Sequence, residues 1–308
     1  MKKAISVAGF ALALWGCSVS FGAGPSFVKV SDHCYYMQLK ESGENIAAVV
    51  TSAGILLVNP PQEPELSVVA GALENLTSKA VRWVVFTEPA LVHASGARFF
   101  AEQNPLFLAS VRHRALSFAK LADKANGKTE VVPPSWMLFE RQMRLFPSSV
   151  EIRIFALQHK ARSGADIVVF VPAEKVLFVG GLFEAARYPD IDTASEGSAA
   201  GWFDGMKQVI DAVPIMKSAI PQVKIDPKSE KEKKPEEYFT VISSRGDASN
   251  LLNMKDLLDS SRKLRSDIAR AVRLGRPCDD FLTSPAADAY RNYSNLDSFA
   301  AQLFAETK

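Results

Sequence analysis

The amino-acid sequence predicts a layered α/β protein, and three observations lead to this prediction. Short apolar segments that suit strands alternate with longer segments whose apolar residues recur at helical spacing. A strand-rich pattern appears near the start of the chain and again in its second half. The 308 residues are 47% hydrophobic and 23% charged, so the chain can bury a large core as one large domain or two small ones.

The first half begins with strands and continues with alternating helices and strands. Strands are predicted at Phe27–Val30, Cys34–Leu39, Asn45–Val50, Gly54–Asn59, Val81–Phe86 and Leu106–Ala109. Helices are predicted at Glu65–Ser78, Ser95–Gln103 and Arg112–Ala125. Pro60 and Pro61 end the fourth strand, because proline lacks the backbone N–H that a sheet needs.

The second half repeats the strand-rich pattern and ends in helices. An edge hairpin is predicted within Val131–Phe146. Further strands are predicted at Val150–Leu157, Asp166–Val171, Lys175–Val179 and, as the last strand, Tyr238–Ile242. Helices are predicted at Trp202–Val213, Asn250–Val272 and Ser294–Glu306.

The charge pattern argues against a nucleic-acid partner. The net charge is +2, the pI is about 8.3, and the basic residues are dispersed without interleaved aromatic residues. One segment, at about Ile225–Glu237, is rich in charge and poor in apolar residues. This composition predicts a solvated surface loop, and a binding role for the loop is the alternative.

Residues 1–24 are interpreted as a secretory signal peptide, which leaves a mature domain at residues 27–308. Lys2 and Lys3 precede an apolar run at Ala4–Trp15 that is too short to span a bilayer. Two processing sites compete. Ser20–Gly22 suits ordinary cleavage, whereas Cys17 ends a lipoprotein-like box and would carry a lipid anchor. We therefore expect export to the periplasm or cell envelope, with membrane attachment only through a lipid at Cys17.

Two cysteines remain in the mature chain, Cys34 and Cys278. Their spacing does not establish whether they pair in an oxidising compartment, and two ordinary thiols are the alternative. No Cys-x-x-Cys motif is present, so a thiolate zinc site is not indicated.

The segment Val84–Phe100 contains the first candidate site. An apolar run ends at Thr87, a loop with Glu88 and His93 follows, and small residues then open the predicted helix. Such loops often carry chemistry, because a rigid scaffold holds both of their ends.

This segment resembles the metal-binding loop of the metallo-β-lactamase superfamily, in which a strand ends in Thr-His-x-His-x-Asp-His-x-x-Gly. Thr87 and Gly96 match the ends of the motif. The family's ligands His, His, Asp and His correspond, in this order, to Glu88, Ala90, Val92 and His93. Only His93 is retained.

The resemblance continues along residues 27–308. Asn45 matches an Asn of the family, and Asn59 replaces an Asp at the end of the following strand. The family's later ligands, a His, an Asp that bridges two metals and a last His, are replaced by Arg162, Gly181 and Arg245.

The resemblance implies a four-layer αββα sandwich of two mixed β-sheets flanked by helices. Active relatives are zinc hydrolases, and catalytic zinc needs about three donor side chains and one open position. Ala90, Val92 and Gly181 offer no side-chain donor, and a guanidinium stays protonated and cannot coordinate. We therefore predict a degenerate site without a metal or another cofactor.

Three interpretations of the altered site remain open. Glu88 pairs with an arginine and plugs the site, or Arg162, Arg245 and His93 form a pocket for a small anion, or a remodelled metal site persists. In every case Glu88, His93, Arg162, Gly181 and Arg245 should meet at one mouth of the sandwich.

The predicted function is that of a non-catalytic binding or scaffold protein of the cell envelope, with a small anion as a candidate ligand. The alternative is a hydrolase of ester, lactam, thioester or phosphoester substrates with a remodelled site. A serine hydrolase is weakly indicated, because no orienting carboxylate is evident for Ser163, Ser243 or Ser244. His159 is interpreted as a surface residue.

Overall fold

The computed structural model describes residues 25–61, 64–89, 103–124, 135–216 and 239–307. The predicted signal peptide, all but the last residue of the helix predicted at Ser95–Gln103, and the charged loop at Ile225–Glu237 lie outside the described residues, so these predictions are not tested. In the described part of the chain, no helix is both long enough and apolar enough to cross a membrane.

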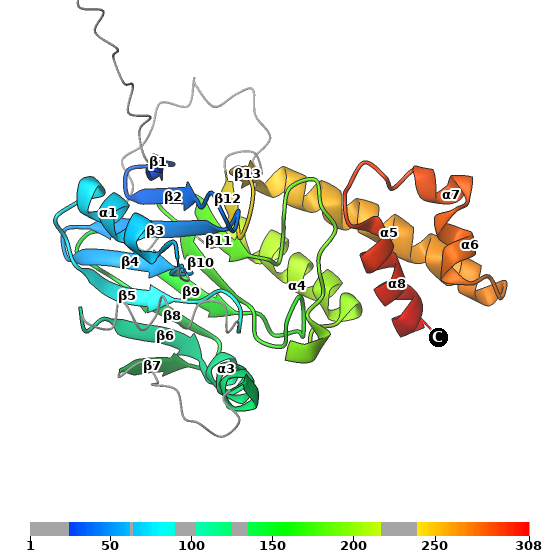
Figure 1. Ribbon diagram of the computed structural model, residues 1–308, viewed down its shortest axis with the longest axis horizontal. Helices are drawn as coiled ribbons and strands as arrows, with labels where there is room; N and C mark the ends of the chain where they lie inside the picture. Colours follow the sequence, from blue (N-terminus) through cyan, green and yellow to red (C-terminus); the bar gives the residue numbers. More distant parts are fainter. Residues whose placement is uncertain (1–24, 62–63, 90–102, 125–134, 217–238, 308) are drawn as a thin grey trace, which may run out of the picture.

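Two mixed β-sheets form the centre of the molecule (Figure 1). The first has seven strands in the order β1–β2–β3–β4–β5–β6–β7. They are β1 (Val28–Lys29), β2 (Cys34–Gln38), β3 (Asn45–Thr51), β4 (Gly54–Val58), β5 (Val81–Val85), β6 (Leu106–Ser110) and β7 (Trp136–Phe139). The second has six strands in the order β13–β12–β11–β10–β9–β8. They are β8 (Gln142–Leu145), β9 (Ile152–Ala156), β10 (Ile167–Val171), β11 (Val176–Gly180), β12 (Thr240–Ser243) and β13 (Ser249–Asn250).

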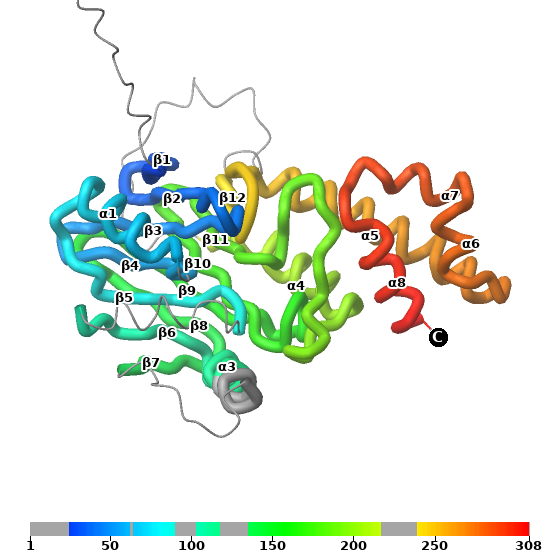
Figure 2. Tube along the Cα trace, viewed as in Figure 1, coloured from blue at the N-terminus to red at the C-terminus, as the bar shows by residue number. Residues whose placement is uncertain are grey.

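The helices form the outer layers. They are α1 (Leu66–Leu76), α3 (Val111–Lys124), α4 (Ala199–Ala212), α5 (Leu251–Arg273), α6 (Cys278–Leu282), α7 (Pro285–Asp288) and α8 (Leu296–Thr307), with 3-10 turns η2 (Thr193–Ser195) and η3 (Val213–Ile215). The chain trace shows α1 beside the first sheet and α4 and α5 beside the second (Figure 2). The predicted sandwich of two mixed sheets with flanking helices is confirmed.

Three apolar layers hold the sandwich together. Between the sheets, Leu56 and Val58 pack in one cluster with Ile154 and Val169. Outside the first sheet, α1 packs on the strands through Val69 and Leu73 among others. Outside the second sheet, one cluster joins strands β10 and β11 to α4, α5 and α8. Because strands β4, β9, β10 and β11 are buried on both faces, nearly all their residues are apolar.

Local sequence signals explain where two of the helices begin. The Ser198 hydroxyl accepts a hydrogen bond from the Gly201 N–H at the start of α4. The Asn250 side chain accepts one from the Asn253 N–H at the start of α5. Both are residues whose side-chain oxygen replaces a missing helical partner. The short helices α6 and α7 were not predicted, because they are too short to show periodicity.

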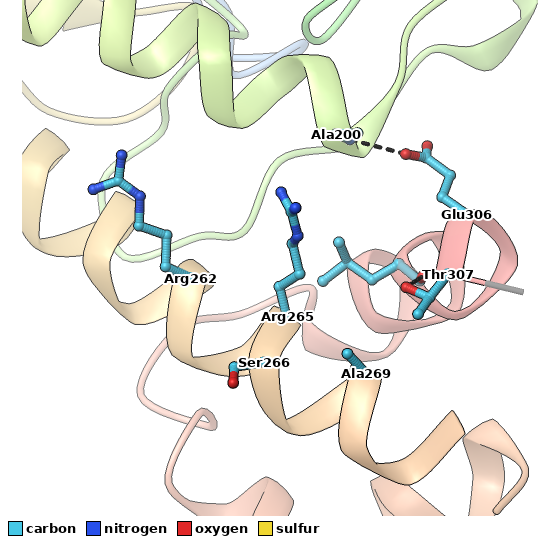
Figure 3. A pocket seen from close by; sticks show the side chains of 8 residues that line it. Ala200, Arg262, Arg265, Ser266, Ala269, Glu306 and Thr307 are labelled. Atoms are coloured by element: carbon cyan, nitrogen blue, oxygen red, sulfur yellow. Dashed lines mark hydrogen bonds between the residues drawn. The ribbon is translucent and has the colours of Figure 1, made fainter. Parts of the chain in front are cut away.

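The end of α8 is attached to the start of α4. The Glu306 carboxylate accepts a hydrogen bond from the Ala199 N–H at 2.7 Å. It accepts another from the Ala200 N–H at 2.8 Å (Figure 3). A negative charge is favourable at the N-terminal end of a helix, where backbone N–H groups lack helical partners. This contact links the last helix to the layer that covers the second sheet.

The prediction of an edge hairpin within Val131–Phe146 is wrong. Trp136–Phe139 forms β7, which pairs in parallel with β6 of the first sheet. Gln142–Leu145 forms β8, which pairs antiparallel with β9 of the second sheet. Alternating side chains indicate that a segment is a strand, but they do not identify its partner, and here each strand extends a different sheet.

Two smaller expectations about the chain are also resolved. The strand predicted at Tyr238–Ile242 is β12, but it is not the last strand, because the two-residue strand β13 follows it. Cys34 and Cys278 form no disulfide. Cys34 lies fully buried between the sheets, whereas Cys278 begins α6 at a partly exposed position, so the two thiols belong to different layers.

Candidate functional site

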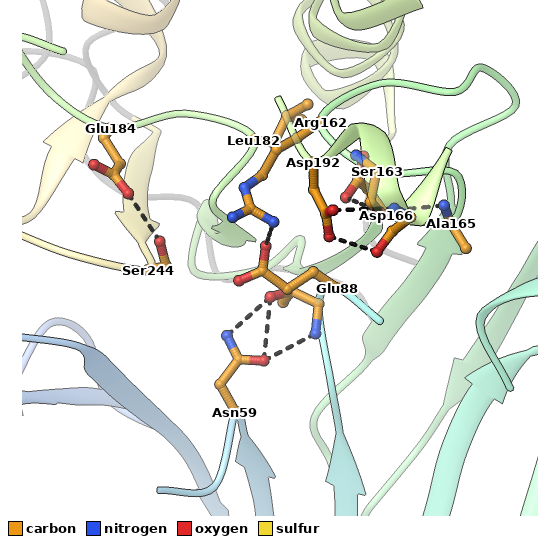
Figure 4. A network of polar contacts seen from close by, with 12 residues as sticks. Asn59, Glu88, Arg162, Ser163, Ala165, Asp166, Leu182, Glu184, Asp192 and Ser244 are labelled. Atoms are coloured by element: carbon orange, nitrogen blue, oxygen red, sulfur yellow. Dashed lines mark hydrogen bonds and ion pairs between the residues drawn. The ribbon is translucent and has the colours of Figure 1, made fainter. Parts of the chain in front are cut away.

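The candidate site lies where loops from both sheets meet. Thr87 and Glu88 follow β5 of the first sheet, Arg162 lies between β9 and β10, and Gly181 follows β11 directly. A close view shows the side chain of Arg162 pointing toward Glu88 across the gap between the two sheets (Figure 4). The structure therefore brings together Glu88, Arg162 and Gly181, as the sequence predicts for these three positions.

Asn59 and Thr87 hold in place the backbone that leads from β5 to Glu88. The Thr87 N–H donates to Asn59 Oδ1 at 2.9 Å, and the Asn59 amide donates to Thr87 Oγ1 at 2.8 Å. The Ile167 N–H of the second sheet donates to the Thr87 carbonyl at 2.7 Å. Asn59 has a positive φ of 54°, which asparagine tolerates better than most residues. Asn59 thus connects the end of β4 to the segment that follows β5.

An ion pair between Glu88 and Arg162 occupies the centre of the site. Arg162 Nη1 contacts Glu88 Oε2, and the two side chains are only 22% and 11% exposed. A Cβ atom at Gly181 would lie 2.5 Å from Arg162 Nε, 2.8 Å from Arg162 Cδ and 3.1 Å from Glu88 Oε2. The arginine side chain therefore fills the space beside position 181, and this is the ion pair that the plugged-site interpretation predicts.

Further carboxylates surround this arginine. Burial by itself would lower the pKa of Arg162, but the charges of Glu88, Asp166, Asp192 and Asp190 outweigh it and raise that pKa. The Arg162 guanidinium is therefore a permanent positive charge among these four acidic side chains. Sequence reasoning did not single out Asp190 and Asp192 as site residues. Their only signal was two acidic residues close together in the segment after β11.

Asp166 is a buried carboxyl next to this ion pair. It accepts hydrogen bonds from the Ser163 N–H at 2.8 Å and from the Ser163 hydroxyl at 2.6 Å. Burial raises its pKa to about 7, with a further increase from the Glu88 charge, although the Ser163 hydrogen bonds and Arg162 oppose the shift. Ser163 is itself fully buried, so its hydroxyl positions Asp166 and is not exposed as a nucleophile.

Arg245 pairs with a different carboxylate. Its Nη2 atom lies 3.5 Å from Glu44 Oε1, and its side chain is 56% exposed. Asn45 holds the same loop, because its amide donates to the carbonyls of Ser243 at 3.1 Å and Gly246 at 2.7 Å. Arg162 and Arg245, the two arginines that the sequence comparison matched to metal ligands, are thus paired with separate acidic residues.

The remaining predicted positions are either undescribed or at the surface. Ala90, Val92 and His93 lie outside the described residues, so the anion pocket of Arg162, Arg245 and His93 stays a prediction. His159 is 47% exposed and lies 3.9 Å from Asp204 on the surface, as predicted.

The described residues do not fit the zinc that the family resemblance implies. Within the parts of the chain described above, no group of three or more His, Cys, Asp or Glu side chains could hold a metal ion. Gly181 supplies no donor where the family has a bridging carboxylate, and the stem of Arg162 fills the space beside it.

Known proteins resemble this chain in structure, whereas comparison of its sequence finds no match. No protein family and no curated protein sequence matches it. Its structure is similar to the stereoselective inverting sec-alkylsulfatase Pisa1 from Pseudomonas sp., with a TM-score of 0.64 and 13% identity. That match covers 92% of this chain and 50% of the other, so the chain spans about half the length of the alkylsulfatase.

Two metallo-β-lactamases are similar over nearly their whole length. The DIM-1 enzyme has a TM-score of 0.54 and 14% identity, and the match covers 77% of this chain and 99% of the other. The enzyme from Pontibacter korlensis has a TM-score of 0.54 and 15% identity, and the match covers 76% of this chain and 99% of the other. Together with the two facing mixed sheets and their flanking helices, these similarities show that the chain has the metallo-β-lactamase fold.

Proposed function

We propose that this chain is a non-catalytic binding or scaffold protein of the cell envelope, in which an internal ion pair has replaced the catalytic metal site. The observation that supports this proposal most is the position of Arg162. Its side chain fills the space beside Gly181 and its guanidinium contacts Glu88. One cation thereby occupies the space beside Glu88, which matches the family's first His ligand, and beside Gly181, which matches its metal-bridging Asp.

Electrostatics supports the same proposal. A guanidinium about 5 Å from a divalent cation would oppose its binding by roughly 7 kcal/mol at an effective dielectric constant near 20. Arg162 cannot escape this conflict by losing its proton, because the surrounding carboxylates raise its pKa. The acidic residues around it would otherwise repel one another, so the arginine performs the charge neutralisation that a metal ion would provide.

Location in the envelope rests on residues 1–24, which have the charge and apolar pattern of an export signal. A role for Arg162, Arg245 and His93 in holding a small anion has less support. Both arginines already contact carboxylates, and an anion would have to compete with Glu88 and Glu44 for them.

The test is the metal content of the mature protein. Protein that has been loaded with zinc and then dialysed would be analysed by mass spectrometry, beside an active metallo-β-lactamase as a positive control. We expect far less than one zinc per chain, a melting temperature that neither zinc nor chelator changes, and no turnover of chromogenic lactam, ester or phosphoester substrates. Tightly held zinc near one per chain would overturn the proposal and favour a hydrolase with a remodelled site.

A matched variant sharpens this experiment. Replacing Arg162→His and Gly181→Asp together removes the cation and restores two side chains of the family's ligand type. If the internal cation is what excludes the metal, this double variant should retain more zinc than the wild type after the same dialysis. Equal zinc retention in the two proteins would argue that the metal is excluded for another reason.

A further inference from the structure

A second concave site lies among the helices that cover the second sheet. A cavity of about 550 Å³ is lined by the first turn of α4, the middle of α5 and the last turns of α8 (Figure 3). Its volume is within the range of small-molecule sites, which is roughly 300–1,000 Å³. None of its lining residues belongs to the Glu88–Arg162 site.

One wall of the cavity is a stripe along α5. The stripe consists of four residues of α5 that are three or four positions apart: Arg262, Arg265, Ser266 and Ala269. This spacing places them on one face of the helix. The side chains of Arg262 and Arg265 both extend from this wall in the close view (Figure 3). Two cations therefore border the same space.

Arg265 keeps its hydrogen-bond donors available. Its guanidinium carbon lies 5.0 Å from the centre of the Phe203 ring, a cation–π contact that supports the group from one face. Within the described part of the chain, no carboxylate lies within ion-pair distance of Arg265. Arg262 differs, because its Nη1 atom lies 3.1 Å from Asp259 Oδ1 on the same helix. Arg265 is therefore the principal candidate to meet a ligand.

The acidic residue of the cavity is already engaged. The Glu306 carboxylate accepts hydrogen bonds from the N–H groups of Ala199 and Ala200, from the Ser198 hydroxyl and from the Gln302 amide. Burial would raise its pKa, but these hydrogen bonds outweigh that effect and lower it, so the group stays ionised and committed to α4. Among the residues that line the cavity, the two arginine charges outnumber this single carboxylate.

The rest of the lining carries no charge, and part of it is apolar. Leu303 is only 2% exposed, and Ala200 and Ala269 add methyl groups beside it. The Ser266 hydroxyl lies on the same wall as the two arginines. A ligand that fits this lining has an anionic end for the arginines and a short aliphatic part for the apolar floor.

We propose that this cavity binds a small organic oxyanion, meaning a carboxylate, phosphate or sulfate carried on a short aliphatic body. The fork of Arg265 suits two parallel hydrogen bonds to such a group, and Arg262 adds a second positive charge. The aliphatic part packs on Leu303 and Ala269. This site is independent of the proposed loss of the metal site, because the two share no residue.

Isothermal titration of the mature protein tests the proposal with three probes: hexyl phosphate, inorganic phosphate and 1-hexanol. We expect hexyl phosphate to bind once per chain, inorganic phosphate to bind more weakly, and 1-hexanol not to bind. Arg265→Gln should weaken hexyl phosphate binding about tenfold or more, because a hydrogen bond to a charged group is lost. Arg265→Lys, which keeps the charge but not the fork, should give an intermediate affinity.

Two control variants make the result specific. Lys263→Gln removes an exposed charge on the same helix outside the cavity, and Arg245→Gln removes an exposed arginine that pairs with Glu44 in another part of the molecule. Both should bind hexyl phosphate as the wild type does. Failure of the wild type to bind any probe, equal affinity in wild type and Arg265→Gln, or an equal loss in a control variant would each overturn the proposal. Circular dichroism and melting temperature would verify that each variant is folded.

Discussion

The side chain of Arg162 lies in the space that a side chain at Gly181 would need. A Cβ atom at position 181 would come within 2.5 Å of Arg162 Nε, which is far inside van der Waals contact. The loop between β9 and β10 and the segment after β11 are therefore coupled. Arg162 can contact Glu88 only while position 181 carries no side chain.

Gly181→Ala should destabilise the protein by about 1–3 kcal/mol, because the new methyl group forces Arg162 away from its partner. In an Arg162→Ala background the same change should be nearly neutral. Urea unfolding of the wild type, the two single variants and the double variant gives the coupling energy between positions 162 and 181. Gly71→Ala in α1 is the control, since a Cβ there meets nothing within 4 Å and should leave the stability equal or slightly higher. An equal cost of Gly181→Ala in both backgrounds would refute the steric coupling.

Glu88→Gln should destabilise the protein by about 2–4 kcal/mol, because it leaves a largely buried guanidinium without its closest carboxylate. Replacing both partners, as Glu88→Gln with Arg162→Met, should cost less than the sum of the single changes. The exposed pair supplies the comparison, since Glu44→Gln should cost less than about 1 kcal/mol. Chemical denaturation measures the stability of Glu88→Gln, Arg162→Met, the double variant and Glu44→Gln. Similar costs for Glu88→Gln and Glu44→Gln would contradict the idea that burial makes the Glu88–Arg162 pair important for stability.

Asp166 should make stability depend on pH between about 4 and 7. Burial raises its pKa from 3.8 to about 7, so in this range the folded state holds a proton that the unfolded state has lost. The free energy of unfolding should therefore fall as pH rises through this window, by about 1.4 kcal/mol per pH unit and about 4 kcal/mol in total, and level off above it.

The check for Asp166 is urea unfolding at several pH values for wild type and Asp166→Asn. The amide does not titrate, so the difference in stability between wild type and variant should shift steadily in favour of the variant as pH rises to about 7. A difference that stays constant across the range would mean that this carboxyl does not carry the expected pH dependence.

Glu306→Gln should destabilise the protein by about 1 kcal/mol, because the charge at the start of α4 is lost. The pKa of Glu306 is lowered in the folded protein. Its stabilising effect should therefore be complete above its ordinary value of 4.5 and disappear as pH falls through the lower folded value. Melting temperatures at about pH 7 and about pH 3 measure this. The deficit of the variant should be smaller at the lower pH, and an equal deficit at both would exclude a role for the charge.

Apolar patterns in the sequence predicted most of the strands and longer helices. The apolar spacing of Leu66, Val69 and Leu73 predicted α1, and the alternating pattern of Val150–Leu157 predicted β9. The apolar runs in Asp166–Val171 and Lys175–Val179 predicted β10 and β11. The pairing of β7 and β8 could not be predicted, because each segment satisfies the pattern of a strand in either sheet. The short helices α6 and α7 carry too few residues for a periodic signal.

The sequence by itself determined the residue types at the ligand positions: Gly181 has no donor and Arg162 and Arg245 carry a charge that repels a metal ion. Only the tertiary structure decided which acidic residue each arginine meets. Glu88 and Arg162 are far apart in the sequence and lie in loops that follow strands of different sheets, and they make contact because the two sheets pack face to face. Side-chain chemistry is local to a residue, whereas pairing and burial depend on contacts between distant segments, which is why the ion pair and the cavity beside α5 emerged only from the folded chain.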